Sequence, residues 1–452
     1  MRLANSTALA KVFIFFFFGA FSAGAVLAQE NSPYSRYGIG DLVPNQNIYH
    51  RGMGGACIAD TNNQVTNTLN PAALANISRT IFDFGGEIDV RTLKSTSSPS
   101  KYTGANTIIS YVQFNFPLTP KKWRERNNAW ALNLGIQPVS RVNYKIQKNE
   151  RKEFPPLSDS MVTIYEGNGG LNKFNIGTAF KFKNLRLGVS SGYAFGNKDF
   201  STRIAFANDS VIYYKSNTES QVHYGGVFVN AGFQYQFRLN AKEDSIPLQK
   251  FISIGGFANF QQSMNAREKL VQETFVYDDN GAVIPLDTIK YDESQKGTIV
   301  LPMTIGAGIA YHDWHWTAAL DFISSNWNNY RYYGTSDNVQ NSWVMKAGIQ
   351  YYPANISNYW KTVKYRLGGY YGQDYVKLDN NRPYYAVTAG ASFPLTPINR
   401  LSGTDRDRAV LHMGLEFGSR GNNQSLGVKE SITRISLGLT VNSSWFIKRS
   451  YY

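Results

Sequence analysis

Apolar and polar residues alternate one by one in many segments between residue 79 and the C-terminus. In residues 433–441, the odd positions carry Thr, Ile, Leu, Leu and Val, whereas the even positions carry Arg, Ser, Gly and Thr. A period of two residues is that of a β-strand with one apolar and one polar face. The same alternation recurs in residues 185–195, 343–351, 363–368, 385–393 and 409–417.

These segments are about ten residues long and are separated by polar turns, which is the pattern of a transmembrane barrel wall. Aromatic pairs such as Tyr351-Tyr352 and Tyr370-Tyr371 stand beside the turns, where amphipathic rings would lie at the lipid headgroups. A large soluble β-sandwich also alternates, but these aromatic strand ends disfavour it. About fifteen segments qualify, and single-chain bacterial barrels have an even number of strands. We therefore predict an all-β fold, a transmembrane antiparallel β-barrel of about 14 strands, with 16 as the alternative.

The longest stretches without this alternation are hydrophilic. Barrels of this class have short turns at one end and longer loops at the other. We therefore expect these stretches to be irregular and to include the extracellular loops. They are residues 144–171, 240–250, 261–296 and 331–342.

The first 28 residues have the features of a secretory signal peptide. Arg2 and Lys11 flank a short polar lead, an apolar run fills residues 12–18, and Val-Leu-Ala at 26–28 offers a cleavage site. After this segment no run of about 18 apolar residues occurs, so helical membrane spans are not expected. We predict export to the outer membrane of a Gram-negative cell, with the barrel occupying residues 79–452.

Residues 29–78 do not alternate and are rich in Gly, Asn and Ala. An irregular backbone at membrane depth is stable only where protein surrounds it. We therefore predict that this segment is a plug inside the barrel. The alternative is a disordered periplasmic leader, which the content of aromatic and β-branched residues disfavours.

Composition and charge narrow the classes of partner. Aromatic residues make up 14% of the chain, which also contains 39 glycines, and this balance suits a barrel wall. The formal net charge is +14, but it is scattered along the chain and an exported protein rarely meets nucleic acid. We expect outer-membrane lipid or an anionic ligand as partners and no nucleic acid. The single cysteine, Cys57, has no partner for an intramolecular disulfide.

Three short motifs within the predicted plug resemble a known family. They are Gly52-Met53-Gly54-Gly55-Ala56, then Ala59-Asp60, then Asn70-Pro71-Ala72. In this order they are similar to the hatch of the long-chain fatty-acid transporter family of outer-membrane proteins, the FadL/TodX group, which precedes a 14-stranded barrel. The resemblance implies that a hatch is shaped by Gly52, Gly54, Gly55, Asp60, Asn70, Pro71 and Ala72.

The resemblance implies passive uptake of a hydrophobic or amphiphilic small molecule. The opening segment 32–38, Ser-Pro-Tyr-Ser-Arg-Tyr-Gly, departs from that pattern and resembles a divergent branch. Some barrels of this family are non-transporting subunits of larger machines, such as the shuttle subunit of type IX secretion. The alternative function is therefore a subunit of an outer-membrane secretion or assembly complex, for instance a barrel-assembly accessory, with other outer-membrane or periplasmic proteins as partners.

Cationic side chains stand at positions that the alternation places in the lumen. They could hold the carboxylate of an amphiphile, or they could pair with the plug or with water. Few acids accompany them on the same faces. The strongest candidates are Lys346, Lys364, Arg366 and Arg434.

The residues give no support for an enzyme, a metal site or a cofactor. His312-Asp313-Trp314-His315 stands at a predicted hairpin tip and lacks a third ligand. His412 and Glu416 share a face, but four residues along a strand separate them by about 13 Å. Gly52-Met53-Gly54-Gly55 lacks the Lys-Ser/Thr of a phosphate-binding loop.

Overall fold

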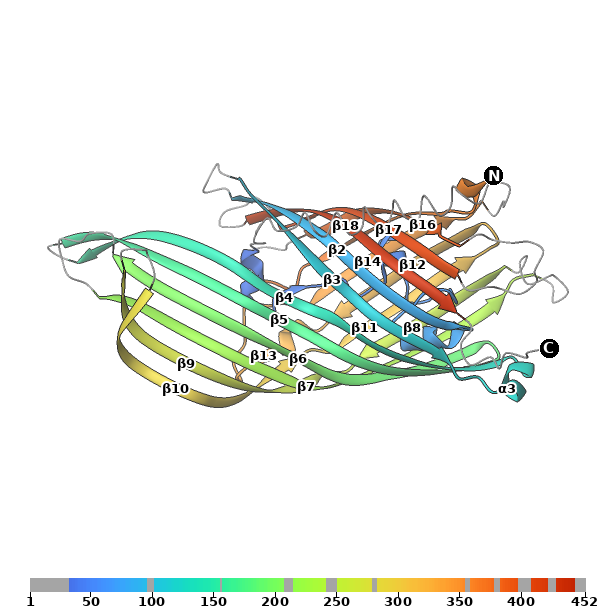
Figure 1. The fold of residues 1–452 in the computed structure, drawn as a ribbon, viewed down its shortest axis with the longest axis horizontal. Helices are drawn as coiled ribbons and strands as arrows, with labels where there is room; N and C mark the ends of the chain where they lie inside the picture. Colours follow the sequence, from blue (N-terminus) through green and yellow to red (C-terminus); the bar gives the residue numbers. More distant parts are fainter. Residues whose placement is uncertain are drawn as a thin grey trace.

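The computed structural model of the chain is a closed barrel of 14 antiparallel strands (Figure 1). Wall strands pair with their neighbours in chain order, and β18 (Val428–Ser443) pairs with β2 (Thr80–Ser95) to close the barrel. The predicted fold class and the preferred strand number are thus confirmed. The predicted signal peptide, 1–28, lies outside the described residues. These are 32–95, 101–154, 157–206, 214–240, 250–278, 283–353, 358–377, 383–396, 408–421 and 428–443.

Two of the wall strands are interrupted at the same height. One consists of β8 (Phe251–Asn259) and β9 (Gln262–Tyr277), and the next consists of β10 (Val283–Leu301) and β11 (Thr304–His312). The uninterrupted wall strands between β2 and β18 are β3 (Lys101–Pro117), β4 (Asn128–Phe154), β5 (Leu157–Phe182), β6 (Leu185–Phe206), β7 (Lys215–Arg238), β12 (Trp316–Ser325), β14 (Ser342–Tyr351), β15 (Lys364–Gln373), β16 (Pro383–Pro394) and β17 (Arg408–Arg420).

The alternation in the sequence corresponds to burial in the wall. Along β18, Arg434 and Ser436 are buried in the lumen, whereas Ile435 between them is exposed on the outer face. An outer face of aliphatic and aromatic side chains is what contact with lipid requires. The expectation drawn from residues 433–441 is therefore correct.

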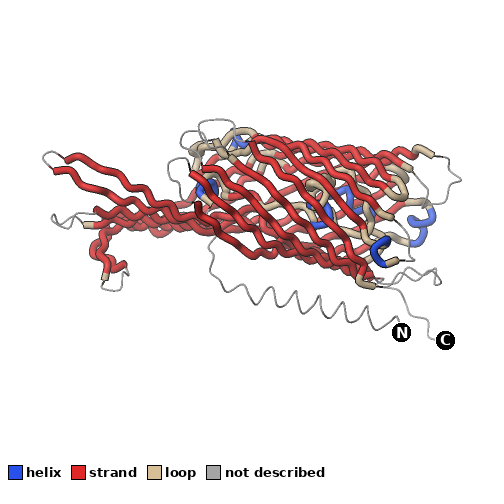
Figure 2. The backbone as a smooth tube through the Cα atoms, turned by 90° about the horizontal axis from the view of Figure 1, so that it is seen from above, coloured by secondary structure: helices blue, strands red, loops and turns tan. Residues whose placement is uncertain are grey.

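Six strands, β4 to β7 with β9 and β10, continue beyond the other wall strands as a projecting sheet (Figure 2). The expectation of irregular loops at 144–171 and 261–296 is wrong, because nearly all of the described residues in both stretches belong to these strands. A strand with water on both faces does not need apolar residues at alternate positions, so its sequence resembles that of a loop. Residues 331–342 do form a loop, apart from the short β13 (Arg331–Tyr332), and 241–249 lie outside the described residues.

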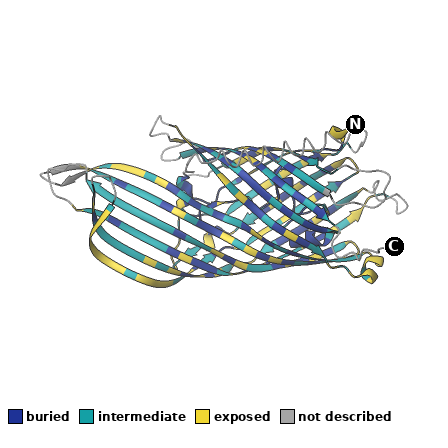
Figure 3. Ribbon diagram, viewed as in Figure 1, coloured by how far each residue is buried: buried dark blue, intermediate teal, exposed yellow. Residues whose placement is uncertain are grey.

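The segment 32–78, called the hatch segment below, lies inside the barrel and is largely buried (Figure 3). Its elements are short because Gly, Asn and Pro interrupt the backbone. Within the described part of the chain, no helix is both long enough and apolar enough to cross a membrane. The hatch elements are η1 (Pro33–Arg36), β1 (Asp41–Leu42), α2 (Ile48–Arg51) and η2 (Pro71–Asn76), and the connections of the wall contain α3 (Lys121–Glu125), η4 (Trp327–Asn329) and η5 (Tyr359–Lys361).

Candidate functional site: the hatch segment and its attachments

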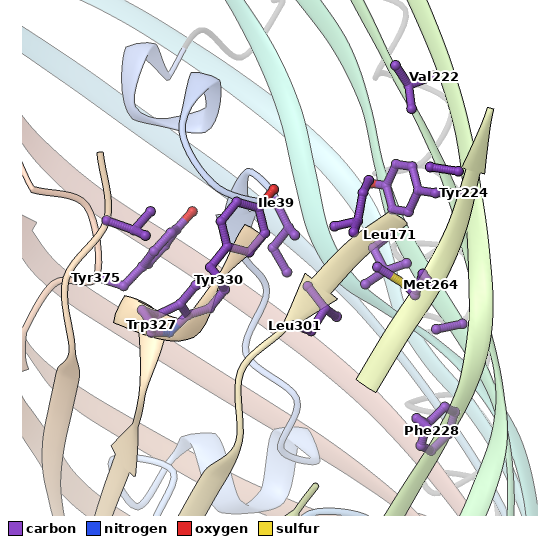
Figure 4. Close-up of a cluster of buried hydrophobic side chains, with 14 of the residues drawn as sticks. Ile39, Leu171, Val222, Tyr224, Phe228, Met264, Leu301, Trp327, Tyr330 and Tyr375 are labelled. Atoms are coloured by element: carbon purple, nitrogen blue, oxygen red, sulfur yellow. The ribbon is translucent and has the colours of Figure 1, made fainter. Parts of the chain in front are cut away.

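The start of the hatch segment packs into an aromatic cluster near the projecting sheet (Figure 4). Ile39 contributes to this cluster beside Trp327, Tyr330 and Tyr375. The Gly38 carbonyl oxygen accepts hydrogen bonds from Lys198 Nζ at 2.6 Å and from Tyr330 Oη at 3.0 Å. The segment that departs from the transporter pattern is therefore fixed to the wall from several sides.

Asp41 in β1 links the hatch segment to two arginines of the wall. Arg91 on β2 donates to Asp41 at 2.6 Å, and Arg420 on β17 donates to the other carboxylate oxygen. Arg420 also donates to Asp374 at 2.6 Å. Burial raises the pKa of Asp41, but the charges of Arg91 and Arg420 outweigh it and hold the pKa below its usual value.

The same ionic network continues down the wall to α2. Arg51 pairs with Glu87 on β2, and Arg434 on β18 donates to Asp89 at 3.0 Å and to Glu416 at 2.8 Å. All of these side chains are nearly inaccessible to solvent. Removing one partner would leave an uncompensated buried charge, so the network favours one position of the hatch segment.

Two of the three predicted hatch glycines, Gly52 and Gly54, lie where the backbone approaches the opposite wall. A Cβ on Gly52 would lie 3.0 Å from the Gly390 Cα atom, and a Cβ on Gly54 would overlap the Gly369 carbonyl oxygen. Gly54 and Gly55 also have positive φ angles of 66° and 79°, which favour glycine. The Gly54 amide donates to Thr388 Oγ1 at 2.8 Å. Gly52 and Gly54 therefore allow backbone-to-backbone contact with β16 and β15, whereas the space beside Gly55 is bordered by the side chains of Lys346 and Gln46.

Asp60 forms a buried pair within the hatch segment. Its carboxylate lies 2.8 Å from His50 Nε2 and 3.9 Å from His312 Nε2 on β11. Burial raises the pKa of Asp60, but the hydrogen bond and charge of His50 outweigh it and lower the pKa overall. Among the described residues, no group of three or more His, Cys, Asp or Glu side chains is arranged to hold a metal ion.

Asn70, Pro71 and Ala72 begin η2 and face glycines of the wall. Asn70 Oδ1 accepts from the Ala72 amide at 3.1 Å as an N-cap, and Asn70 Nδ2 donates to the Ile58 carbonyl oxygen at 2.8 Å. A Cβ on Gly188 would overlap the Pro71 backbone. The Asn-Pro-Ala motif therefore both starts the short helix and seats it on β6.

The four predicted lumen cations have different surroundings. Lys364 donates to Gln64 at 3.2 Å, Arg366 donates to Gln350 at 3.0 Å and stacks 3.8 Å from the Tyr49 ring centroid, and Arg434 belongs to the ionic network. Lys346 contributes to the lining of a cavity between the hatch segment and the wall. The expectation of few lumen acids is wrong. The buried acids of the wall are Asp83, Glu87, Asp89, Asp321, Glu416 and Glu430.

A cavity of about 330 Å³ lies between the hatch segment and the wall. Gly54, Gly55 and Leu69 of the hatch segment contribute to its lining. Much of the opposite lining is apolar, including Phe228, Phe257, Leu301, Trp327 and Trp343. Such a mixture of apolar walls and a few charged groups can hold an amphiphile.

Several residues of the site were missed from the sequence. Asp41, Arg91 and Arg420 had no recognisable signal, because barrel closure brings them together. Asp321, which accepts from the amides of Cys57 at 2.6 Å and Ile58 at 2.9 Å, could have been noticed as an acid on an otherwise apolar strand.

A family model matches almost the whole chain, over residues 9–452, and is described as BamG. The chain belongs to the BamG family. A comparison with curated protein sequences finds no match. The resemblance to the FadL/TodX group therefore describes the barrel type, and the family to which the chain belongs carries the name BamG.

Solved structures of FadL-type channels share the fold of this BamG-family chain. The CymD monoaromatic hydrocarbon channel has a TM-score of 0.52 at 15% identity and covers 90% of this chain and 99% of its own. The Ralstonia pickettii toluene transporter TbuX has a TM-score of 0.51 at 14% identity, with 88% and 98% covered. A Pseudomonas aeruginosa FadL homologue has a TM-score of 0.53 at 11% identity, with 90% and 99% covered. The shared fold is that of an outer-membrane barrel.

Proposed function

We propose that this protein is a sealed outer-membrane barrel that acts as a subunit of a secretion or barrel-assembly complex. The observation that carries the proposal is the attachment of the hatch segment by the buried network of Asp41, Arg51, Arg91, Arg420 and Arg434. A hatch that moves during transport would have to separate these pairs inside a low-dielectric lumen, at a cost of several kcal/mol for each broken pair.

The projecting sheet supplies a surface for protein partners. Its strand β10 carries Ile284, Leu286, Ile289 and Tyr291, which are between 46% and 67% exposed. These residues lie beyond the apolar part of the wall, so lipid does not cover them. Exposed apolar side chains outside a membrane are typical of protein interaction sites.

The free edge of β10 adds to this surface. In the described part of the chain, β10 pairs along one side with β9, and on its other side only Ile299 and Val300 pair, with β13. Register shifts interrupt β10 at three places, which blunts the edge against indiscriminate strand pairing. Side chains of β10, more than its backbone, would therefore contact the partner.

The test is extraction of the tagged full-length protein from its native membrane in mild detergent, followed by mass spectrometry of co-purifying proteins and lipids. We expect stoichiometric recovery of other outer-membrane proteins. Replacing residues 273–289 by Asn-Gly joins the paired residues Gln272 and Lys290 in a shorter β9–β10 hairpin and should abolish this recovery. The matched control shortens the β4–β5 hairpin at 148–163, whose end is rich in charged residues. Recovery of the chain alone would contradict the proposal.

The 330 Å³ cavity favours a second candidate function, uptake of a hydrophobic or amphiphilic small molecule. In this case the purified chain would carry such a molecule, and Trp343→Ala in the cavity lining would change its affinity. Vesicles containing the reconstituted protein would also take up a fluorescent fatty acid faster than protein-free vesicles. Uptake at the protein-free rate would exclude this candidate.

A further inference from the structure

A row of basic residues crosses the outer face of the wall where the projecting sheet begins. His223 on β7 is paired in register with Arg267 on β9, and Arg267 is paired with Lys296 on β10. Paired residues of antiparallel strands project from the same face, and all three side chains are exposed. Like charges directly opposite each other destabilise a sheet unless an anion lies between them.

These residues form no ion pair with an acidic side chain in the part of the chain that the structure describes. The outer-facing neighbour of His223 on β6 is Asn197. Two residues farther along the strands, away from the barrel body, the next outer-facing row contains Asp199, Gln221 and Lys269. Asp199 accepts a hydrogen bond from Asn197 at 2.8 Å. The protein therefore brings two cations together without placing an acid against them.

The height of this row coincides with the edge of the apolar band. Four residues closer to the barrel body along the strands, Phe174, Tyr193 and Val227 form a row that is 42%, 51% and 63% exposed. Such a row on a barrel faces lipid tails. Phe195 stands between the apolar row and the charged row, at the position of an interfacial aromatic residue. The charged row therefore lies at the level of lipid headgroups.

A groove of about 810 Å³ joins the two rows. Its lining includes Tyr193, Phe195, His223, Arg267 and Lys296. Gly225, on the same outer face, has no side chain, and the Tyr193 ring lies over its backbone: a Cβ there would lie 2.6 Å from the Tyr193 hydroxyl oxygen and 2.9 Å from its Cζ. Tyr193 thus leans from the apolar band towards the cations.

We propose that this groove binds the phosphorylated headgroup of a membrane lipid. Arg267 and Lys296 would hold the phosphate, His223 would donate to it, and the acyl chains would lie along the apolar band that begins with Tyr193 and Val227. The charge of the row and its continuity with a lipid-facing surface favour a lipid over a soluble anion. This inference is independent of the proposed complex, because it concerns the outer face of the wall and needs no partner protein.

The test is native mass spectrometry of the full-length protein in detergent with phosphatidic acid, compared with diacylglycerol of the same acyl chains. We expect one phosphatidic acid to be retained and diacylglycerol not to be retained. The variant Arg267→Gln/Lys296→Gln should lower the affinity at least tenfold. The control Lys269→Gln/Lys290→Gln removes the same charge from the same two strands farther from the apolar band, and it should change the affinity less than twofold.

A second variant tests the groove without changing its charge. Gly225→Val displaces the Tyr193 ring within the groove, and because Tyr193 is exposed on the outer face and can turn aside, the barrel should still fold. It should also weaken phosphatidic acid binding at least tenfold. The proposal is overturned if diacylglycerol binds equally well, if both double variants lose the same affinity, if Gly225→Val binds normally, or if an equal concentration of inorganic phosphate displaces the lipid.

Discussion

The two parts of the hatch segment are attached to the barrel in different ways. Residues 32–51 are held mainly by charged and polar side chains, with Asp41 and Arg51 paired to β2 and β17. Residues 52–77 approach the wall with their backbone, which contacts β15 at Gly54 and β6 at Pro71 and exchanges hydrogen bonds with wall side chains such as Thr388 and Asp321. The first attachment depends on charge and is sensitive to protonation, whereas the second depends on shape and is sensitive to a single added methyl group.

This difference indicates that, at neutral pH, each part of the hatch segment is held in the lumen by its own set of contacts. Ionic pairs in the lumen are strong only while both partners stay in place. The glycine contacts hold residues 52–77 against the opposite side of the wall. This helps to keep Asp41 and Arg51 opposite their partners on β2 and β17. We propose that together they hold the N-terminal segment as a closure of the barrel, in agreement with the proposed structural role.

The largest effect should come from breaking the charged attachment at Arg434. Arg434→Met would remove the cation that Asp89 and Glu416 share, leaving Asp89 with Arg91 and Glu416 with only the Tyr370 hydroxyl, and we expect a loss of about 3–5 kcal/mol in the free energy of unfolding. Urea unfolding in lipid vesicles, followed by tryptophan fluorescence, measures it. The control Arg124→Met changes an exposed arginine of α3 and should cost less than about 0.5 kcal/mol. Equal losses in both variants would mean that the network contributes little.

The shape-dependent attachment can be tested with a smaller change, Gly54→Ala. Its positive φ costs about 1–2 kcal/mol for any residue with a Cβ. Overlap with the backbone of Gly369 should add about 1–3 kcal/mol. The control is Gly334→Ala, because Gly334 also has a positive φ, of 78°, but a Cβ there meets nothing within 4 Å. The same unfolding assay should show a greater loss for Gly54, and equal losses would exclude the close contact.

The two attachments also differ in how far the sequence predicts them. The motif around Gly52, Gly54 and Gly55 is local, so it can be recognised before the fold is known. The partners of Asp41 are 50 and 379 residues away in the sequence. They meet because β18 closes on β2, and only the strand register defines that contact.

A comparison of the wall with the projecting sheet shows the same limit of prediction from the sequence. Strands in the lipid band were predicted because lipid requires alternate apolar residues, as in residues 433–441. The strands of the projecting sheet have water on both faces, and the sequence of 261–296 therefore lacks the signal. The sequence thus predicts the architecture of the wall, but neither the extension that we propose as a partner surface nor the ionic network.

The smallest expected effect is that the first part of the hatch segment is released from the wall at low pH. This effect still distinguishes the two attachments. The folded-state pKa of Asp41 lies below the usual value of 3.8 because Arg91 and Arg420 outweigh the effect of burial. Its contribution to stability is therefore complete above about pH 4 and is lost as the pH falls through the lowered folded-state pKa. Hydrogen exchange should show residues 32–42 losing protection in this range before residues 52–55 do. In Asp41→Asn, protection of residues 32–42 should be lower at neutral pH and should change less on acidification, because no carboxylate remains at this position to be protonated. Simultaneous loss of protection in both parts would show that the hatch segment is released as one unit and that the Asp41 pairs do not control its first part.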